Sequence, residues 1–321
     1  MEALMIRAAS VKCHASSLVL SLPQAHLPHL ATVKQTIRFS HRGGSANALA
    51  TLPSWTSTYK QQCRASPPCY YSATSSTAIS DQRLDLALSV GSVVIPHPAK
   101  VEKGGEDAFF VSSHNGGVLG VADGVSGWAE ENVDPALFSR ELVERAVTAL
   151  DSEVVGICPR QLLAKAHEAT SAIGAATVII AILEKETGVL HVANLGDCGL
   201  RVVRRGKIVF ATLTQQHYFD CPYQLSSEPG AQTSSDAMVY KVELLPGDIV
   251  VMGSDGLFDN LFDKDIESTA NCFGGSDDDC PQRIASALAS LASKHSKDKK
   301  YESPYSQEAI LQASTILLKL S

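Results

Sequence analysis

Residues 107–124 read DAFFVSSHNGGVLGVADG and carry the clearest indication of the fold class. Two short apolar runs, residues 108–113 and 117–122, flank a Ser-Ser-His-Asn-Gly turn signal. Short apolar runs on either side of such a turn are typical of a β-hairpin. The second run ends in Asp123-Gly124, so that an acidic residue stands where a buried strand stops. The stretch predicts antiparallel sheet and places a possible functional side chain at its edge.

The same pattern recurs along the chain and is interrupted by three helical stretches. We expect further hairpins where β-branched runs flank Glu-Thr-Gly, Arg-Arg-Gly and Pro-Gly-Asp: 176–184 with 189–194, 200–203 with 207–212, and 238–244 with 249–253. Helices are expected from Pro135 to Leu150, after an Asp134 N-cap, from Pro159 to about 171, and from about 281 to 294. Paired antiparallel sheets flanked by helices bury all these faces. The predicted fold class is therefore α+β, a β-sandwich of two antiparallel sheets flanked by helices.

The first 80 residues differ in composition from the rest. They hold seven Lys and Arg residues against one acid, Glu2, a charge of about +6, whereas the whole chain carries −7, which leaves −13 for residues 81–321. A basic stretch rich in Ser, Thr and Ala, without sustained apolar periodicity, is typical of an organelle transit peptide. We predict a disordered leader over 1–80 and one domain over 86–321, in a chloroplast protein or, as the alternative, a mitochondrial one.

Composition also restricts the partners. The longest apolar run, residues 173–183, is shorter than the roughly 18 residues that a membrane span needs. The five cysteines after the leader form no CxxC pair, so neither a zinc site nor a disulfide framework is indicated. A strongly acidic domain repels phosphate backbones, which makes nucleic acid an unfavourable partner. We expect no membrane span, no nucleic-acid binding and a monomer.

Acidic residues stand at the ends of the predicted strands at four places. These are Glu106-Asp107, Asp123-Gly124, Asp197, and Asp255-Gly256 with Asp259. Each Asp-Gly alone is typical of a turn. Together, carboxylates gathered at strand ends would repel one another unless a cation neutralised them. Because oxygen ligands select hard divalent ions, the pattern favours Mg²⁺ or Mn²⁺.

Five segments then resemble the motifs of the PP2C family of metal-dependent serine/threonine phosphatases, in order and in approximate spacing, over about residues 90–300. They are 106–108 (Glu-Asp-Ala), 121–125 (Val-Ala-Asp-Gly-Val), 174–177 (Gly-Ala-Ala-Thr), 194–197 (Asn-Leu-Gly-Asp) and 253–260 (Gly-Ser-Asp-Gly-Leu-Phe-Asp-Asn). Residues 103–107, 123–128 and 219–225 look most like the organellar subgroup. The resemblance implies a sandwich of two antiparallel sheets and the hydrolysis of phosphoserine and phosphothreonine in proteins.

The resemblance also implies a site. It assigns Asp107, Asp123, the Gly124 carbonyl and Asp255 to two divalent cations, with Glu106 holding a metal-bound water. Asp197 and Asp259 match positions for a weaker third ion. A hydroxide that bridges the two cations would attack phosphorus, with no covalent enzyme intermediate. Phosphoprotein substrates follow from the same likeness.

Three features depart from the family pattern. Val125 stands where the family usually has a histidine that protonates the leaving group. Only Lys100 and Lys103 stand where an arginine usually binds phosphate, and we take Lys103 as the candidate. No aspartate follows Asp298, although the family closes with an aspartate ligand and a last core strand. We therefore expect an incomplete or divergent carboxyl-terminal end, with residues 313–320 as a substitute strand.

Two alternatives remain open at this level. Cys198 and Arg204 fit C-x₅-R of cysteine-dependent phosphatases, although Asp197 beside Cys198 disfavours a thiolate. A catalytically weak or inactive pseudophosphatase that binds phosphoproteins is the second alternative, because of the three departures. Phosphate release from a phosphothreonine peptide with added Mn²⁺ separates the metal-dependent enzyme from the pseudophosphatase.

Overall fold

The computed structural model describes residues 4–13, 86–152, 156, 158–273 and 279–320, and these build two large antiparallel sheets. The five-stranded sheet has the order β2-β1-β13-β7-β8, and the six-stranded sheet has the order β12-β6-β5-β4-β3. The strands of the first are β1 (Leu4–Cys13), β2 (Leu86–Ile95), β7 (Gly199–Arg204), β8 (Lys207–Ala211) and β13 (Ile249–Gly253). Those of the second are β3 (Asp107–Ser112), β4 (Val118–Gly124), β5 (Ala175–Glu184), β6 (Val189–Leu195) and β12 (Met238–Glu243).

Alternation along the strands makes the two sheets a sandwich. Successive side chains of a strand point to opposite faces. In β5, Ile179 and Ala181 belong to one buried cluster, which also contains Leu200 of β7 and Met252 of β13. A cluster that draws on both sheets fills the space between them, so this is the inner core. The α+β sandwich predicted from the sequence is confirmed.

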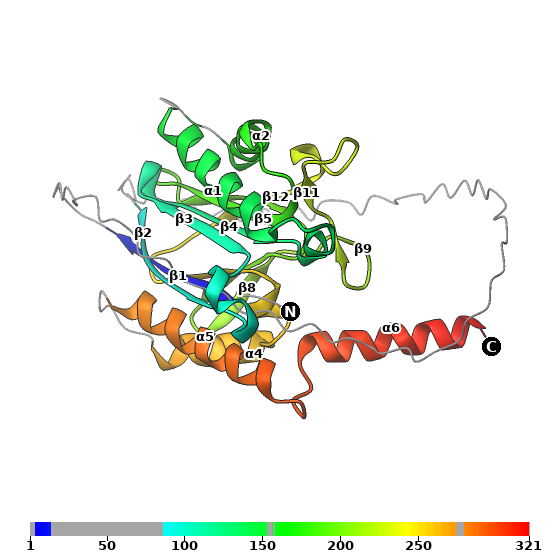
Figure 1. The fold of residues 1–321 in the computed structure, drawn as a ribbon. Coiled ribbons are helices and arrows are strands. Elements are labelled where there is room, and N and C mark those ends of the chain that lie inside the picture. Colours follow the sequence, from blue (N-terminus) through cyan, green and yellow to red (C-terminus); the bar gives the residue numbers. More distant parts are fainter. Residues whose placement is uncertain (1–3, 14–85, 153–155, 157, 274–278, 321) are drawn as a thin grey trace, which may run out of the picture. The chain divides into compact units, whose positions relative to one another are not determined.

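Helices cover the outer faces. The other residues of β5, such as Ile180, pack with Phe138 and Leu163 of two helices, while Val251 of β13 packs with Leu288 of another. Figure 1 shows α1 and α2 over β3, β4 and β5, and α5 beside β1 and β2. The α-helices are α1 (Pro135–Asp151), α2 (Pro159–Ala169), α3 (Asp255–Phe258), α4 (Asp263–Cys272), α5 (Cys280–Lys297) and α6 (Pro304–Leu320).

The predicted helices are present. Asp134 caps α1, since its Oδ1 accepts a hydrogen bond from Ala136 N at 3.1 Å, and Pro135 occupies the first turn. The helices expected at 159–171 and 281–294 are α2 and α5, with small differences at their ends. The sequence patterns missed α4, whose buried residues are only Ile266 and Ala270.

Three of the four predicted hairpins are confirmed, because β3 pairs with β4, β5 with β6, and β7 with β8. The fourth is wrong: β12 pairs with β6, whereas β13 pairs with β7 in the other sheet. A partly buried ion pair lies at the crossing. Arg204 Nε and Nη2 donate to Asp248 Oδ1 and Oδ2 at 2.9 and 2.7 Å, and Asp248 is buried. This contact fixes the start of β13 beside β7.

The two ends of the chain differ from expectation. Leu4–Cys13, within the predicted leader, form β1 inside the five-stranded sheet, and the remainder of residues 1–80 lies outside the described residues. The substitute strand expected at 313–320 is wrong, because these residues belong to α6. The segment is rich in Leu, Ile, Gln and Ala and has Pro304 in the first turn, which favours a helix.

Short elements complete the described chain. They are β9 (Gln216–Tyr218), β10 (Cys221–Pro222), β11 (Leu225–Ser226), and the 3₁₀ turns η1 (Pro98–Lys103), η2 (His114–Gly116), η3 (Ser126–Glu131) and η4 (Ser234–Asp236). The two short strands β9 and β10 pair with each other, and β11 pairs with β5. Within the described ranges, no helix has both the length and the apolarity to cross a membrane.

Candidate metal centre

Asp107 and Asp123 lie opposite each other on neighbouring strands. They are Cα partners at one end of the β3 and β4 pairing, and both are buried, 7% and 4% exposed. Directly opposite residues of an antiparallel pair have Cβ atoms about 4.5–5.5 Å apart. Two buried carboxylates at this separation repel each other unless a cation or a proton neutralises them. The predicted pairing of acids at this strand end is thus present.

Gly124 follows where the chain has no room for a side chain. A Cβ there would lie 2.3 Å from the backbone oxygen of Pro135 and 2.8 Å from that of Glu106. The Gly124 amide donates to the Glu106 carbonyl at 3.1 Å, which ties the two acidic segments together. Any larger residue would push the end of β4 away from Glu106, so the glycine is required by close approach.

Glu106 is buried and held from two sides. Ser126 Oγ donates to its Oε2 at 3.0 Å, and Lys100 forms an ion pair with its Oε1. Its backbone carbonyl also accepts a hydrogen bond from Ser139 Oγ of α1. The carboxylate therefore has a fixed orientation. The sequence patterns identified Glu106 but not Ser126 or Ser139.

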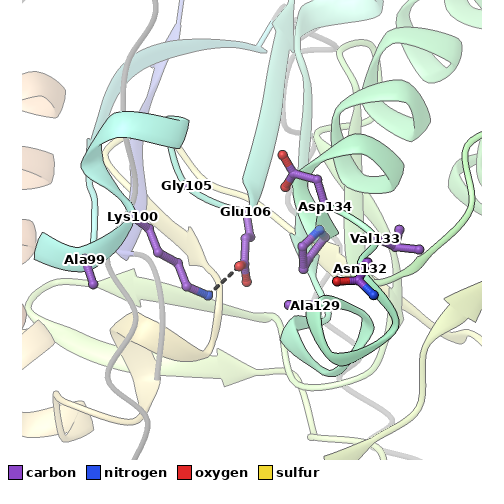
Figure 2. A pocket seen from close by; sticks show the side chains of 9 residues that line it. Ala99, Lys100, Gly105, Glu106, Ala129, Asn132, Val133 and Asp134 are labelled. Carbon is purple, nitrogen blue, oxygen red and sulfur yellow. Dashed lines mark hydrogen bonds and ion pairs between the residues drawn. The ribbon is translucent and has the colours of Figure 1, made fainter.

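A cavity of about 420 Å³ borders Glu106. Figure 2 shows Lys100 directed at Glu106 on one side, with Asn132 and Asp134 on the other. A second cavity, of about 450 Å³, is lined by Val125, Trp128, Glu131 and Glu228 among others. Open space therefore adjoins both Glu106 and the turn after Gly124.

The third acid comes from the opposite sheet. Asp255 begins α3 directly after β13, and the preceding Ser254 donates from Oγ to Asp107 Oδ2 at 3.1 Å. Ser254 is fully buried, so this bond joins the end of β13 to the end of β3 inside the protein. Strands that are far apart in sequence thus bring Asp255 beside the Asp107 segment.

Asp259 and Asp197 belong to the same acidic cluster. The pKa of Asp259 is raised well above its ordinary value, first by burial and then by neighbouring carboxylates, those of Asp197, Asp220 and Asp123. Asp197 follows Gly196, which has a φ of +104°. A Cβ at Gly196 would lie 2.5 Å from the Tyr223 carbonyl oxygen, so this position has no room for a side chain. Of this cluster the sequence patterns missed Asp220, which lies in the turn between β9 and β10 and carries no Asp-Gly signal.

The donor set suits a hard divalent cation. It consists of carboxylate and backbone oxygens, which Mg²⁺ and Mn²⁺ prefer, and Mg²⁺ usually retains several waters beside one or two carboxylates. Among the described residues no group of three His, Cys, Asp or Glu side chains is arranged to hold one ion.

Lys103 is the last residue of η1, next to the Gly104-Gly105 turn that leads into Glu106. Gly104 caps this turn with a φ of +73°. The side chain of Lys103 lies outside the described side chains, so its role in phosphate binding stays a prediction. Lys100, the other lysine near this turn, contacts Glu106.

Tyr305 connects α6 to the acidic cluster. Its amide donates to the Asp259 carbonyl at 3.2 Å, and its ring lies 5.1 Å from that of Phe219 between the centroids. Burial, followed by the charge and hydrogen bond of Asp220, raises the pKa of Tyr305 far above its usual value. The start of α6 therefore packs against the β9–β10 turn, a contact that no sequence pattern indicated.

The cysteine mechanism has no support at Cys198. Its thiol is buried and lies 3.3 Å from Thr177 Oγ1. Burial first, and then the charges of Asp123 and Asp197, raise its pKa well above the ordinary value. Arg204, the other half of the C-x₅-R pattern, is engaged with Asp248. A neutral, enclosed thiol is a poor nucleophile.

Known proteins are similar to this chain over most of the described domain. A rice protein described as a probable protein phosphatase 2C 1 is 56% identical over 227 residues, which cover 71% of this chain and 67% of the relative. An Arabidopsis thaliana protein described as a probable protein phosphatase 2C 26 is 55% identical over 231 residues, 72% of this chain and 76% of the relative. The chain belongs to the protein phosphatase 2C family. It is therefore a protein serine/threonine phosphatase, a hydrolase.

Two further comparisons agree with this assignment. The family model for stage II sporulation protein E (SpoIIE) matches residues 129–301. An X-ray structure of the photosystem II phosphatase PBCP is 56% identical and superposes with a TM-score of 0.64, covering 68% of this chain and 84% of that one. The resemblance inferred from the motifs is confirmed at the level of family and fold.

Proposed function

We propose that this phosphatase hydrolyses phosphoserine and phosphothreonine with two divalent cations, Mg²⁺ or Mn²⁺, held by Asp107, Asp123, the Gly124 carbonyl and Asp255. The observation that carries the proposal is the pairing of Asp107 with Asp123, together with the bond from Ser254 to Asp107. When bound, such ions lower the pKa of water so that hydroxide is available at neutral pH, and they neutralise phosphate charge.

The protein's own residues orient this site. Ser254 holds one oxygen of Asp107, and Ser126 with Lys100 holds Glu106, which we assign to a coordinated water. Val125 occupies the position after Gly124 and cannot donate a proton from its side chain. Solvent from the adjoining cavity would then protonate the departing serine or threonine oxygen.

Two further assignments extend the site. Asp197 and Asp259 would hold a third, weaker ion, a role supported by the carboxylates that surround Asp259. Lys103, at the turn before Glu106, would bind the substrate phosphate as a point charge.

We also propose that the protein acts in the chloroplast on thylakoid phosphoproteins such as those of photosystem II. Support comes from the likeness to the photosystem II phosphatase PBCP and from the basic, acid-poor composition of residues 1–80, which we interpret as a transit peptide. A fluorescent fusion of residues 1–85 should enter plastids. Cytosolic fluorescence would contradict the targeting proposal and leave the activity untouched.

Phosphate release from a phosphothreonine peptide tests the activity. We expect release with added Mn²⁺ or Mg²⁺ and none with a chelator, because the carboxylates cannot activate water alone. A phosphotyrosine peptide of the same sequence is the matched control. Release that is unaffected by the chelator would contradict the proposal, and absence of release under all conditions would favour the pseudophosphatase.

A further inference from the structure

Strand β1 lies between β2 and β13 in the five-stranded sheet, although it comes from the amino-terminal end of the chain. It pairs antiparallel with β2 over ten residues, from Leu4 opposite Ile95 to Cys13 opposite Leu86. On its other side it pairs with β13 over four residues, from Arg7 opposite Met252 to Ser10 opposite Ile249. Without β1, the facing edges of β2 and β13 would each present unpaired backbone groups.

Strand β2 is held in place by contacts that do not involve β1. The Gln282 side chain of α5 accepts from Ser92 N at 3.0 Å and donates to Ser92 O at 3.2 Å. At the neighbouring Gly91 the backbone of Gln282 is so close that a Cβ would lie 2.3 Å from its nitrogen. At the start of β2, buried Leu86 donates from N to Lys185 O at 3.1 Å. The strand on one side of β1 is therefore anchored to α5 and to the β5–β6 turn.

Strand β13 is anchored from the opposite direction. It pairs with β7 over all five of its residues, and Arg204 binds Asp248 immediately before it. Val250 and Met252 of β13 contribute to the inner core, and Val251 packs under α5. Both neighbours of β1, the strands β2 and β13, are thus fixed by the rest of the domain.

We propose that the gap between β2 and β13 is a strand-docking slot, and that Leu4–Cys13 is its occupant, bound by backbone pairing as an added β-strand. Recognition of this kind uses main-chain hydrogen bonds to an exposed sheet edge, here two edges at once. The segment LMIRAASVKC suits it, since it contains no proline, which would remove a donor, and no glycine. Its two cationic residues, Arg7 and Lys12, match a domain that carries −13 outside the leader.

Leu4–Cys13 lie inside the region that we interpret as a transit peptide, so removal of that region would vacate the slot. The leader then has a structural use in the full chain besides targeting. This inference depends on the strand pairings and not on the catalytic proposal.

Cleavage of the connection tests the docking in the full chain. A specific protease sequence inserted within residues 37–82 allows the amino-terminal segment to be cut from the body after folding. We expect the cut segment to remain with the body in size-exclusion chromatography at micromolar concentration. In Ala8→Pro the segment should separate, because proline in a central strand removes a ladder hydrogen bond. Separation of the unsubstituted segment as readily as the proline variant would overturn the proposal.

Cross-linking gives a second readout that does not depend on a proline variant. Ser10 and Ser89 are register partners, so Ser10→Cys with Ser89→Cys should form a disulfide, detected by mass spectrometry of peptides. The control, Ser10→Cys with Ser92→Cys, is offset by three residues, roughly 10 Å along β2. Equal yields of the two cross-links would overturn the register and with it the slot.

Discussion

Asp107 and Asp123 face each other across β3 and β4 and are both buried, and the neighbouring Glu106 borders a cavity. Like charges directly opposite on an antiparallel pair are destabilising. The site is therefore built from carboxylates whose repulsion a bound cation would relieve.

Asp123→Asn should stabilise the protein when divalent ions are absent. Removing one of two opposed carboxylates relieves roughly 0.2–1 kcal/mol of repulsion, so in chelator Tm should rise by at most about 2–4 °C. Differential scanning fluorimetry with and without Mn²⁺ measures this. With Mn²⁺ the order should reverse, because the wild type gains more from the ion. A lower Tm for the variant in chelator would indicate that Asp123 is already neutralised by the protein.

The wild-type enzyme should need a high Mn²⁺ concentration for full activity. Hard divalent ions that are bound through one or two carboxylates, such as the paired Asp107 and Asp123, keep several waters, so the affinity should be low. An activity titration with Mn²⁺ gives the half-maximal concentration. Saturation at trace Mn²⁺ would mean that further ligands complete the site.

Arg204→Ala should destabilise the domain by about 2–3 kcal/mol, since it leaves the buried carboxylate of Asp248 without its guanidinium partner. This figure is below that for a fully buried pair because the Arg204 side chain is partly exposed. Urea unfolding measures the change. The control is Arg145→Ala, which removes a more exposed i,i+4 ion pair with Glu141 on α1 and should change stability much less. Equal effects of the two substitutions would remove the explanation given for the placement of β13.

Glu141 should add stability at neutral pH that is lost in acid. The pKa of Glu141 is lowered from 4.5, first by the hydrogen bond from Arg145 and then by those from Ala172 and Ser171. Burial raises this pKa but does not outweigh them. A folded-state pKa below the unfolded value stabilises the protein above pH 4.5, and this stabilisation disappears as pH falls through the folded pKa. The stability difference between wild type and Glu141→Gln should therefore shrink from pH 7 to pH 3. A difference independent of pH would point to packing alone.

The sequence predicted the sandwich because strand periodicity and turn residues are local signals, as in residues 107–124. It failed where a distant contact decides the structure. The Pro-Gly-Asp turn after β12 has the composition of a hairpin turn, yet the next strand, β13, pairs with β7 in the other sheet, where Arg204 binds Asp248. The strand at Leu4–Cys13 escaped notice because its pairing lies with residues 86–95 and 249–252, far along the chain.

The acids of the site were predictable because each one, apart from Asp220, lies at or near a strand end within one of the five family-like motifs. Residues that orient them were not, since Ser126 and Ser254 are ordinary serines until the fold brings them beside Glu106 and Asp107. Tyr305 was missed for the same reason, as α6 lies beyond the motif region.

The proposed metal centre is tested by Mn²⁺-dependent phosphate release from a phosphothreonine peptide, measured for wild type, Asp123→Asn and Cys198→Ser. We expect Asp123→Asn to lose about 100-fold or more of the activity, since an ion-stabilised transition state is worth several kcal/mol. Cys198→Ser should retain most of the activity, because that thiol is enclosed and neutral. Retained turnover in Asp123→Asn, or abolished turnover in a folded Cys198→Ser, would contradict the metal centre proposed for this phosphatase.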